Sequence, residues 1–364
     1  MDLAVIGGGP AGAVAARLAA LRGHTVVVLE AAPAPRRKPG EGLPPRVRPL
    51  LEQLQLCHYL DDPRIALPCQ GVRALTGTTT MEFPFIGSRY GAGWRVARQP
   101  FETLLMEAAH AAGVAWRSSC TATRIERVGQ RWQLDTRGAR GPTPVPARIQ
   151  ARFVIDASGR SSWVARRLGA RRIRKDRLLA VCRHYRAVTA PARDTDSWIT
   201  VESVPQGWWY SCRLPSGIAS VMYFVDSDLA ELGTLKSNEG WQRALADAPA
   251  TAEYLANGWH AADEVHRTDA GTSYLDRMSG DGWLAVGDAA VAFDPLSSQG
   301  LDNALTAGYY AAHAAHDWLA GKPDALAAYE HLVGYGYRAY LSELPGAYRR
   351  LAPAAPGPFW QRRA

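Results

Sequence analysis

A glycine pattern near the start of the chain constrains the fold most. Gly7, Gly9 and Gly12 form a G-x-G-x-x-G motif between an apolar strand-like segment, 3–6, and a helix-like segment, 10–22. In this setting the first glycine permits a tight turn, the second lets the backbone approach a pyrophosphate, and the third lets the helix pack against the strand. The N-terminus of the helix also offers free N–H groups to phosphate. The pattern predicts the start of a dinucleotide-binding βαβ unit.

An acidic residue stands at the place where such a unit contacts ribose. Glu30 ends the next predicted strand, 25–29, and lies 18 residues beyond Gly12. A carboxylate there accepts hydrogen bonds from ribose hydroxyls. The residues expected to contact the dinucleotide at this end are Gly7, Gly9, Pro10, Ala11, Gly12, Glu30, Ala31 and Arg37.

A late strand and turn favour FAD over NAD. The apolar segment 283–286 is followed by Gly287 and Asp288, then by a helical segment at 300–319. Asp288 is placed to accept hydrogen bonds from a ribityl chain. The following helix would aim its positive N-terminus at the pyrimidine edge of a flavin, which becomes negative on reduction. Further expected cofactor contacts at the start of that helix are Gly300 and Leu301.

The segments between these motifs predict an interrupted domain. A helix is expected at 98–113, paired strands at 114–135, a strand at 152–155, and alternating strands with little helix at 178–275. The fold class is therefore α/β, with a Rossmann-like dinucleotide domain interrupted by a mostly antiparallel β substrate domain. The expected bounds are 1–75, 97–165 and 276–330 for the dinucleotide domain, 76–96 and 166–275 for the substrate domain, and 331–364 for a C-terminal helix and tail.

Three segments rich in Pro, Gly or Ala look irregular. They predict a linker at 32–49, a hairpin tip at 138–146 and an exposed end at 351–364.

Composition excludes several functions. The net charge is +8, yet the basic residues lack the aromatic-spaced ladder of a nucleic-acid module. No stretch approaches the roughly 18 apolar residues of a membrane-spanning helix, so no membrane segment is expected. The start has no charged leader, which predicts a cytoplasmic protein. The five cysteines lack metal-ligand spacing, so free thiols and no metal site are expected.

Taken together, the motifs resemble those of FAD-dependent monooxygenases of the para-hydroxybenzoate hydroxylase fold. The matching segments are GGGPAG at 7–12, Glu30, Arg98 at the start of RQPFETLL, DASG at 156–159, and Gly287-Asp288. The resemblance covers most of the chain and implies an FAD-binding domain of the glutathione reductase type. It also implies that Arg98 reaches the phosphates or ribityl chain of FAD and that Ala122 lies near the adenine.

Five further segments narrow the resemblance to one branch. GEGLPP at 40–45, AFDPLSSQG at 292–300 and GWWYSCRLP at 207–215 are similar to motifs of the tryptophan-halogenase-like group. The ending FWQRR at 359–363, with GWRVARQPFETLL before it, is closer to the LodB-like flavoproteins. Those flavoproteins modify a tryptophan of a partner protein during quinone-cofactor maturation.

One absent residue type separates two kinds of chemistry within this branch. Flavin-dependent halogenases deliver halogen through a lysine, which the resemblance would place between residues 60 and 90. This chain has no lysine between 39 and 174. Ala292 also replaces a phenylalanine, and Tyr210 a tryptophan, of the halogenase motifs. These differences favour a monooxygenase over a halogenase.

The resemblance then implies an enzyme that hydroxylates an electron-rich aromatic through a flavin C4a-hydroperoxide. Tryptophan or indole is the expected substrate, free or within a peptide, protein or carrier-bound molecule, and O2 is the co-substrate. Because a second G-x-G-x-x-G is absent, electrons are expected from transiently bound NAD(P)H or from a separate flavin reductase. The alternatives are a halogenase, a flavin reductase like the geranylgeranyl reductases, and a non-catalytic FAD-binding partner of a quinoprotein.

The candidate catalytic residues are Glu41, Pro295, Ser298, Trp208 and Tyr210. Glu41 is expected to orient the substrate or the flavin, or to act as a base. The alternative is a loop carboxylate paired with Arg37 or Arg46. His184 and Tyr185 belong to no motif and are interpreted as structural.

Two of these candidates have a packing alternative. Trp208 and Tyr210 share one face of a predicted strand, while Trp209 lies on the other. The shared face is either an aromatic wall for a planar substrate or ordinary sheet core. Ser297 and Ser298, in the same way, are candidate caps of the helix that begins near residue 300.

Overall fold

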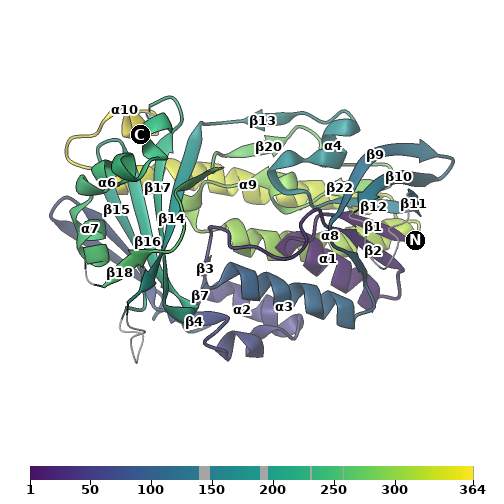
Figure 1. Ribbon diagram of the computed structural model, residues 1–364. Coiled ribbons are helices and arrows are strands. Elements are labelled where there is room, and N and C mark those ends of the chain that lie inside the picture. The colour runs from purple at the N-terminus through teal and green to yellow at the C-terminus, as the bar shows by residue number, and fades with distance from the viewer. Residues whose placement is uncertain (139–147, 189–195, 230–231, 257, 364) are drawn as a thin grey trace.

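One half of the molecule is built on a mainly parallel sheet (Figure 1). The computed structural model describes residues 1–138, 148–188, 196–229, 232–256 and 258–363. Within these ranges the six strands of the sheet lie in the order β21 (Ser279–Gly280), β22 (Trp283–Ala285), β12 (Phe153–Asp156), β1 (Leu3–Ile6), β2 (Val26–Leu29) and β8 (Ala115–Arg117). β1, β2 and β12 read LAVI, VVVL and FVID and are fully buried, because a parallel sheet is covered on both faces.

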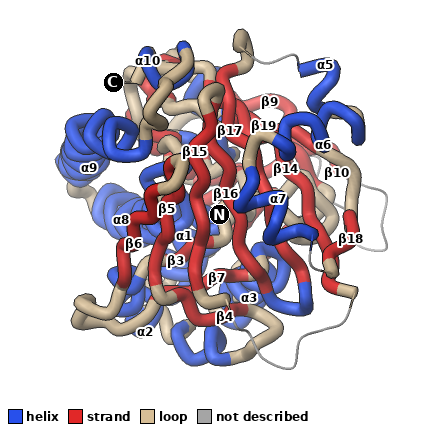
Figure 2. Tube along the Cα trace, turned by 90° about the vertical axis from the view of Figure 1, so that its left-hand side faces the viewer, coloured by secondary structure: helices blue, strands red, loops and turns tan. Residues whose placement is uncertain are grey.

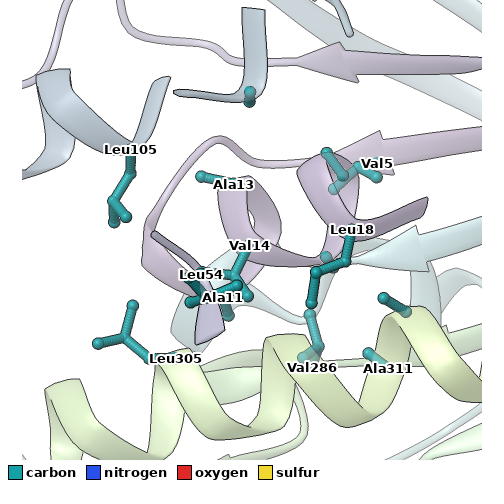
Figure 3. Packing of buried hydrophobic residues seen from close by; sticks show 14 of the residues in the cluster. Val5, Ala11, Ala13, Val14, Leu18, Leu54, Leu105, Val286, Leu305 and Ala311 are labelled. Atoms are coloured by element: carbon teal, nitrogen blue, oxygen red, sulfur yellow. The ribbon is translucent and has the colours of Figure 1, made fainter. Parts of the chain in front are cut away.

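Helices cover one face of this sheet. They are α1 (Pro10–Leu21), α3 (Arg98–Ala111) and α8 (Gly300–Leu319). Figure 3 shows part of the buried cluster beneath them, with Val14 of α1, Leu105 of α3 and Leu305 of α8. α1 and α8 pack closely because their facing residues are small: a Cβ at Gly308 would lie 2.5 Å from the carbonyl oxygen of Ala11.

The opposite face carries a second layer of strands and helices. Its elements are β9 (Cys120–Val128), β10 (Arg131–Gly138), β11 (Arg148–Ala151), α4 (Trp163–Arg167) and α9 (Asp324–Leu351). Trp132, Val164 and Tyr337 from these elements share a buried cluster with Ala4 and Leu29 of the sheet.

The other half of the molecule is a large, mostly antiparallel sheet, seen face-on in Figure 2. Its described strands lie in the order β18 (Trp259–Ala261), β14 (Leu178–Ala187), β17 (Ile218–Asp226), β16 (Gly207–Leu214), β15 (Trp198–Val204), β5 (Gly71–Thr76) and β6 (Thr79–Pro84), with β19 (His266–Asp269) also paired to β14. Only β15 and β5 pair in parallel among these strands. The mostly antiparallel substrate domain that the sequence predicts is therefore confirmed.

Each face of the large sheet buries a different set of side chains. Trp209 lies on the outer face, in a cluster with Trp241. Trp208 and Tyr210 lie on the inner face, which confirms the alternation read from the sequence. The helices on the outer face are α5 (Leu232–Leu235), α6 (Asn238–Ala246) and α7 (Pro249–Ala256).

The long helix α9 connects the two halves, and several smaller elements complete the fold. α9 runs along both of them in Figure 1, with Tyr340 in the core of the first half and Tyr348 in the core of the large sheet. The remaining helices and strands are β3 (Gly42–Leu43), α2 (Arg48–Gln53), β4 (Ala66–Cys69), β7 (Gly93–Val96), β13 (Arg172–Arg174), β20 (Ser273–Leu275), β23 (Val291–Ala292) and α10 (Pro358–Gln361). No described helix is both long and apolar enough to cross a membrane.

Three expectations about irregular or helix-poor segments are wrong. The region 178–275 contains α5, α6 and α7, because the outer face of the large sheet needs an apolar cover. The supposed linker 32–49 contains β3 and the start of α2, and buries Leu43 and Val47. The supposed exposed end carries α10, whose Phe359 and Trp360 are buried beside Trp208.

One expected domain boundary falls inside a strand, and one expected hairpin tip falls mostly outside the described residues. The boundary expected at residue 75 lies inside β5, which pairs with β15 along its length. The hairpin tip expected at 138–146 lies, beyond residue 138, outside the described residues, while β10 and β11 on either side pair in antiparallel fashion.

Candidate active site

The glycine turn after β1 packs against the protein at Gly7 and Gly12 and faces a cavity at Gly9. Gly7 has a φ of +108°, and a Cβ there would lie 2.3 Å from the carbonyl oxygen of Ala157. A Cβ at Gly12 would lie 2.1 Å from the carbonyl oxygen of Gly7. The Cβ position of Gly9, by contrast, has no atom within 4 Å, and Gly9 lines a cavity. The turn therefore leaves room for a phosphate at the N-terminus of α1.

Glu30 braces this turn. One carboxylate oxygen, Oε2, accepts a hydrogen bond of 2.7 Å from the N–H of Gly8, and Oε1 accepts one of 2.7 Å from the N–H of Ala32. Each carboxylate oxygen has a second lone pair available. Since Glu30 also lines the cavity, it can accept a ribose hydroxyl while it holds the glycine turn.

The cavity has a volume of about 700 Å³ and extends from the glycine turn to the large sheet. This volume lies within the range of small-molecule and cofactor sites. The sequence-predicted residues that line it are Gly7, Gly9, Pro10, Ala11, Glu30, Ala31, Glu41, Arg98, Ala122, Tyr210, Asp288, Pro295, Ser298, Gly300 and Leu301. The fold thus brings together residues of both halves of the molecule.

Three sequence-predicted residues do not line the cavity. Gly12 lies behind the glycine turn, where it serves packing. Arg37 reaches away, with Nη1 3.9 Å from Oδ2 of Asp263. Trp208 is 1% exposed and stacks on Phe224 at a ring distance of 3.9 Å, so it belongs to the sheet core.

Asp288 lies where the late turn meets α1. It belongs to a short 3-10 helix, Gly287–Ala289. Gly287 has a φ of +58°, and a Cβ there would lie 2.9 Å from the Cβ of Ala11. The carboxylate of Asp288 lies 3.5 Å from Nε of Arg160 and lines the cavity.

The first turn of α8 contributes the other wall at this end. Gly300 and Leu301 line the cavity, and the N-cap residue, Gln299, makes no side-chain cap hydrogen bond. The expected capping by Ser297 or Ser298 is therefore wrong. Ser297 instead donates to the carbonyl oxygen of Asp294, and Ser298 adopts a left-handed backbone with a φ of +52°.

Arg98 forms hydrogen bonds with the backbone of the loop that leads to Glu41. Its Nη1 donates to the carbonyl oxygens of Pro39, at 2.7 Å, and Gly40, at 3.1 Å. Its Nη2 donates to Glu102, which also pairs with Lys38. Arg98 and Lys38 both line the cavity and share one carboxylate, Glu102, so the three groups leave a net positive charge at the cavity wall.

Glu41 is a buried carboxyl that faces the cavity. It is 1% exposed, and its Oε2 accepts a hydrogen bond of 2.9 Å from the N–H of Gly40. Its Oε1 has no hydrogen-bond partner among the described residues. Burial raises the pKa of Glu41, although Ser220, His184 and Arg98 act to lower it.

The alternative interpretation of Glu41, as a carboxylate paired with an arginine of its own loop, is wrong. Arg46 pairs with Asp302 at 2.5 Å, and Arg37 points toward Asp263. Glu41 is therefore left with a raised pKa and one unused oxygen, a combination typical of functional carboxyls.

Apolar side chains of the large sheet surround this carboxyl. The residues of the inner face that line the cavity are Ala180, Ile199, Tyr210, Met222 and Phe224. The hydroxyl of Tyr210 donates to Sγ of Cys212 at 3.2 Å, and burial holds the pKa of this tyrosine well above its ordinary value. The wall therefore offers a planar apolar surface with neutral polar groups.

Sequence reasoning missed several residues that meet at the site. Arg160 lines the cavity beside Asp288, and its only sequence signal was its place after the DASG segment. His184, which no motif marks, acts electrostatically to lower the pKa of Glu41. The described residues contain no group of three or more His, Cys, Asp or Glu side chains that could hold a metal ion.

The geometry fits FAD. The open space before Gly9 suits a pyrophosphate, the carboxylates of Glu30 and Asp288 can accept hydroxyl groups of a ribose and a ribityl chain, and these residues line one cavity with the first turn of α8. Buried Nε of Arg98 has no partner among the described residues and is a further donor.

Comparison with known proteins also indicates an FAD-binding protein. Residues 1–332 match the FAD binding domain family. The chain is 29% identical over its whole length to the putative FAD-dependent oxidoreductase LodB of Marinomonas mediterranea, covering 96% of that protein. It is also 29% identical over 331 residues to a tryptophan 2-halogenase of Chondromyces crocatus, covering 90% of this chain and 63% of that enzyme.

Solved structures agree with this placement. The flavin-dependent halogenase CmlS, 26% identical, superposes over 100% of this chain and 67% of its own with a TM-score of 0.87. The chondrochloren halogenase CndH, 24% identical, has the same fold, with a TM-score of 0.88 over 100% of this chain and 85% of its own. The chain therefore belongs to the FAD binding domain family and is an FAD-dependent oxidoreductase.

Proposed function

We propose that this enzyme is a monooxygenase that hydroxylates an electron-rich aromatic ring, with tryptophan or indole as the substrate class. Reduced FAD and O2 would supply the chemistry: one oxygen atom replaces a ring hydrogen, the other leaves as water, and the flavin provides two electrons. The cofactor would be held by Gly9, Glu30, Arg98, Asp288 and Gly300.

One observation carries this proposal. Of the described acidic residues that line the cavity, only Glu41 is buried, and it stands among apolar side chains with Oε1 unused. An indole N–H or a phenol O–H would satisfy this oxygen, while the ring would lie against Tyr210 and Phe224. When ionised, Glu41 would orient the ring and withdraw a proton as the ring reacts. The apolar wall would exclude water from the reacting atoms.

The lysine pattern supports oxygen transfer rather than halogen transfer. Lys38, the lysine that lines the described cavity, pairs with Glu102 at 2.7 Å. Residues 39–174 contain no lysine that could deliver halogen. Halogenation stays the second candidate because several relatives, including the tryptophan 2-halogenase, carry that activity in their names.

The form of the substrate and the source of electrons are part of the proposal. A tryptophan within a peptide, protein or carrier-bound molecule agrees with the whole-length match to LodB and with a relative that acts on a peptidyl-carrier substrate. Electrons would come from NAD(P)H or a separate flavin reductase.

The test is a turnover assay with defined halide. The purified protein, FAD, an NADH-driven flavin reductase and O2 are incubated with free tryptophan or tryptophan-containing peptides, with and without chloride or bromide. We expect a product that gains one or two oxygen atoms, labelled from ¹⁸O2, whether or not halide is present. A halide-dependent gain of chlorine or bromine would overturn the proposal in favour of a halogenase.

Two matched variants test whether Glu41 acts in turnover or in FAD binding. Glu41→Gln should lower turnover at least tenfold while FAD binding stays unchanged, since the amide cannot accept a proton. Glu107→Gln, at an exposed position of α3, is the control and should behave as wild type. Equal losses of turnover and FAD affinity in Glu41→Gln would instead make Glu41 a cofactor ligand.

A further inference from the structure

The segment 359–363, whose sequence FWQRR is similar to that of the LodB-like flavoproteins, packs against the inner face of the large sheet. Phe359 and Trp360 are buried there, and the side chain of Arg363 is 9% exposed. Nη1 and Nη2 of Arg363 donate to the two carboxylate oxygens of the buried Asp226 on β17, at 3.0 Å and 2.5 Å. A bidentate pair of this kind fixes the orientation of the guanidinium.

The guanidinium of Arg363 lies over the ring of Tyr348 on α9. It stands 5.2 Å from the centre of that ring, and the ring centre of Trp360 lies 5.9 Å from the same point. Tyr348 is itself buried. The segment 359–363 therefore forms part of the wall that holds the Tyr348 hydroxyl in place.

This hydroxyl bonds to a buried carboxyl in the segment before α8. It donates to Oδ2 of Asp294 at 2.7 Å, while Oδ1 of Asp294 accepts a hydrogen bond of 2.9 Å from the N–H of Leu296. The backbone N–H of Asp294 donates to the hydroxyl of Tyr340, also on α9, at 2.9 Å. Two tyrosines of one helix thus hold the side chain and the backbone of Asp294, which is 1% exposed.

Asp294 caps a short helix that borders the cavity. It is the N-cap residue of the 3-10 helix Pro295–Ser297. Pro295 and Ser298 line the cavity, and α8 begins two residues later at Gly300. A change in the hydrogen bonds of Asp294 is therefore passed to the cavity wall through adjacent backbone.

We propose that Asp294 and Tyr348 are positioning residues for the cavity wall at 295–298, and that the segment 359–363 acts on the flavin site through them. When Asp294 is ionised, both of its oxygens accept a hydrogen bond. Protonation turns one oxygen into a donor and weakens the bond that this oxygen accepts, so the wall shifts. The inference rests on the flavin ring lying at the first turn of α8, which the proposed function shares, but it does not rest on hydroxylation.

The groups around Asp294 set the charge of its carboxyl. Burial raises the pKa of Asp294 to about 6, its two hydrogen bonds and Arg363 act to lower this pKa, and Asp176 acts to raise it. Burial also raises the pKa of Tyr340 and of Tyr348, so both hydroxyls stay neutral. Asp294 is therefore the group of this set that changes charge in mildly acidic solution.

The experiment follows two signals in one titration of the oxidised holoprotein, from about pH 5 to about pH 8. The infrared carbonyl band of protonated Asp294 is identified as the band lost in Asp294→Asn. The visible circular dichroism of bound FAD reports the surroundings of the flavin ring, and the part that depends on Glu41 is identified with Glu41→Gln. We expect a further part of the flavin signal to share the midpoint of the Asp294 band and to be absent from Asp294→Asn.

Three variants test the connection to the segment 359–363. Tyr348→Phe keeps the ring and removes the hydroxyl, and loss of this bond to a carboxylate should raise both midpoints by about one to two pH units. Arg363→Gln removes a positive charge that lowers the pKa of Asp294, so it should raise both midpoints by a smaller amount. Arg362→Gln is the matched control and should leave them unchanged, since Arg362 also pairs with Asp226, at 3.1 Å, but is 44% exposed at its side chain.

A flavin signal without an Asp294-dependent part would make Asp294 a purely structural carboxyl and overturn the inference, even if the infrared band titrates. Unchanged midpoints in Tyr348→Phe would overturn it as well, and unchanged midpoints in Arg363→Gln would refute the role of the segment 359–363. If Arg363→Gln does not fold because Asp226 is left as an unpaired buried charge, Arg363→Gln combined with Asp226→Asn serves instead. The titration needs no turnover, so it distinguishes failure of this inference from failure of the hydroxylation proposal.

Discussion

Replacing Gly9 by alanine separates cofactor binding from folding. Gly9 has a φ of −68° and a ψ of −179°, which alanine adopts without strain, and its Cβ position has no atom within 4 Å. The variant should therefore fold with a melting temperature close to that of wild type when FAD is absent. The new methyl group would occupy the space in front of the turn, where the phosphate must approach the backbone.

The size of the effect follows from the contact that is lost. A phosphate oxygen approaches a backbone N–H to about 2.8 Å, which the methyl group prevents. Loss of one hydrogen bond to a charged group costs about 1.5–3 kcal/mol. At about 1.4 kcal/mol per tenfold change, the Kd for FAD should rise roughly 10- to 150-fold.

Titration of the apoprotein with FAD, followed by flavin fluorescence quenching, measures this Kd. Gly7→Ala is the matched comparison, because its φ of +108° and its 2.3 Å contact with Ala157 should destabilise the fold itself. That variant should lower the melting temperature even without FAD. Wild-type FAD affinity in Gly9→Ala would refute the placement of the pyrophosphate.

Three other changes have expected outcomes. Asp288→Ala should weaken FAD binding about tenfold through loss of a ribityl hydrogen bond, whereas the exposed Asp281→Ala should not; equal Kd values by titration would exclude that role. Trp360→Ala should reduce the free energy of unfolding in urea by about 3–5 kcal/mol, since it empties a buried site and removes a 2.8 Å bond to the carbonyl oxygen of Val204; a loss below about 1 kcal/mol would contradict the packing. Because burial raises the pKa of Glu41, the folded state binds its proton more tightly than the unfolded chain does. The stabilisation that comes from this tighter proton binding is complete below the ordinary pKa of 4.5. It is lost as the pH rises through the raised pKa of Glu41 in the folded protein. Glu41→Gln should flatten that decline in urea unfolding across pH, and an identical pH profile would disprove the shift.

The sequence was sufficient to predict the turn, the strand end and the helix that form the candidate cofactor end of the site. Gly7, Gly9, Glu30 and the 300–319 helix act through local geometry, in which a turn, a strand end or a helix start places the group. Residue spacing along one or two elements is enough to state such geometry. The expected helix at 300–319 is confirmed without a shift of its ends.

The surroundings of the candidate substrate end were decided by tertiary structure. The sequence placed Glu41 in a linker, but the loop anchored by Arg98 buries it against the large sheet. His184 and Ser220, which both act to lower the pKa of Glu41, are paired through the register of β14 with β17, which no local pattern encodes.

The C-terminal segment illustrates the same division. Its proline and alanine content predicted an exposed end, while Trp360 fills a space that Trp208 and Tyr348 leave on the inner face of the large sheet. Local sequence thus determined the elements that form the candidate cofactor end of the site, because each depends on its own backbone conformation. Tertiary structure decided which carboxyl is buried and where the tail packs, because those properties depend on side chains brought together from elements far apart in the chain.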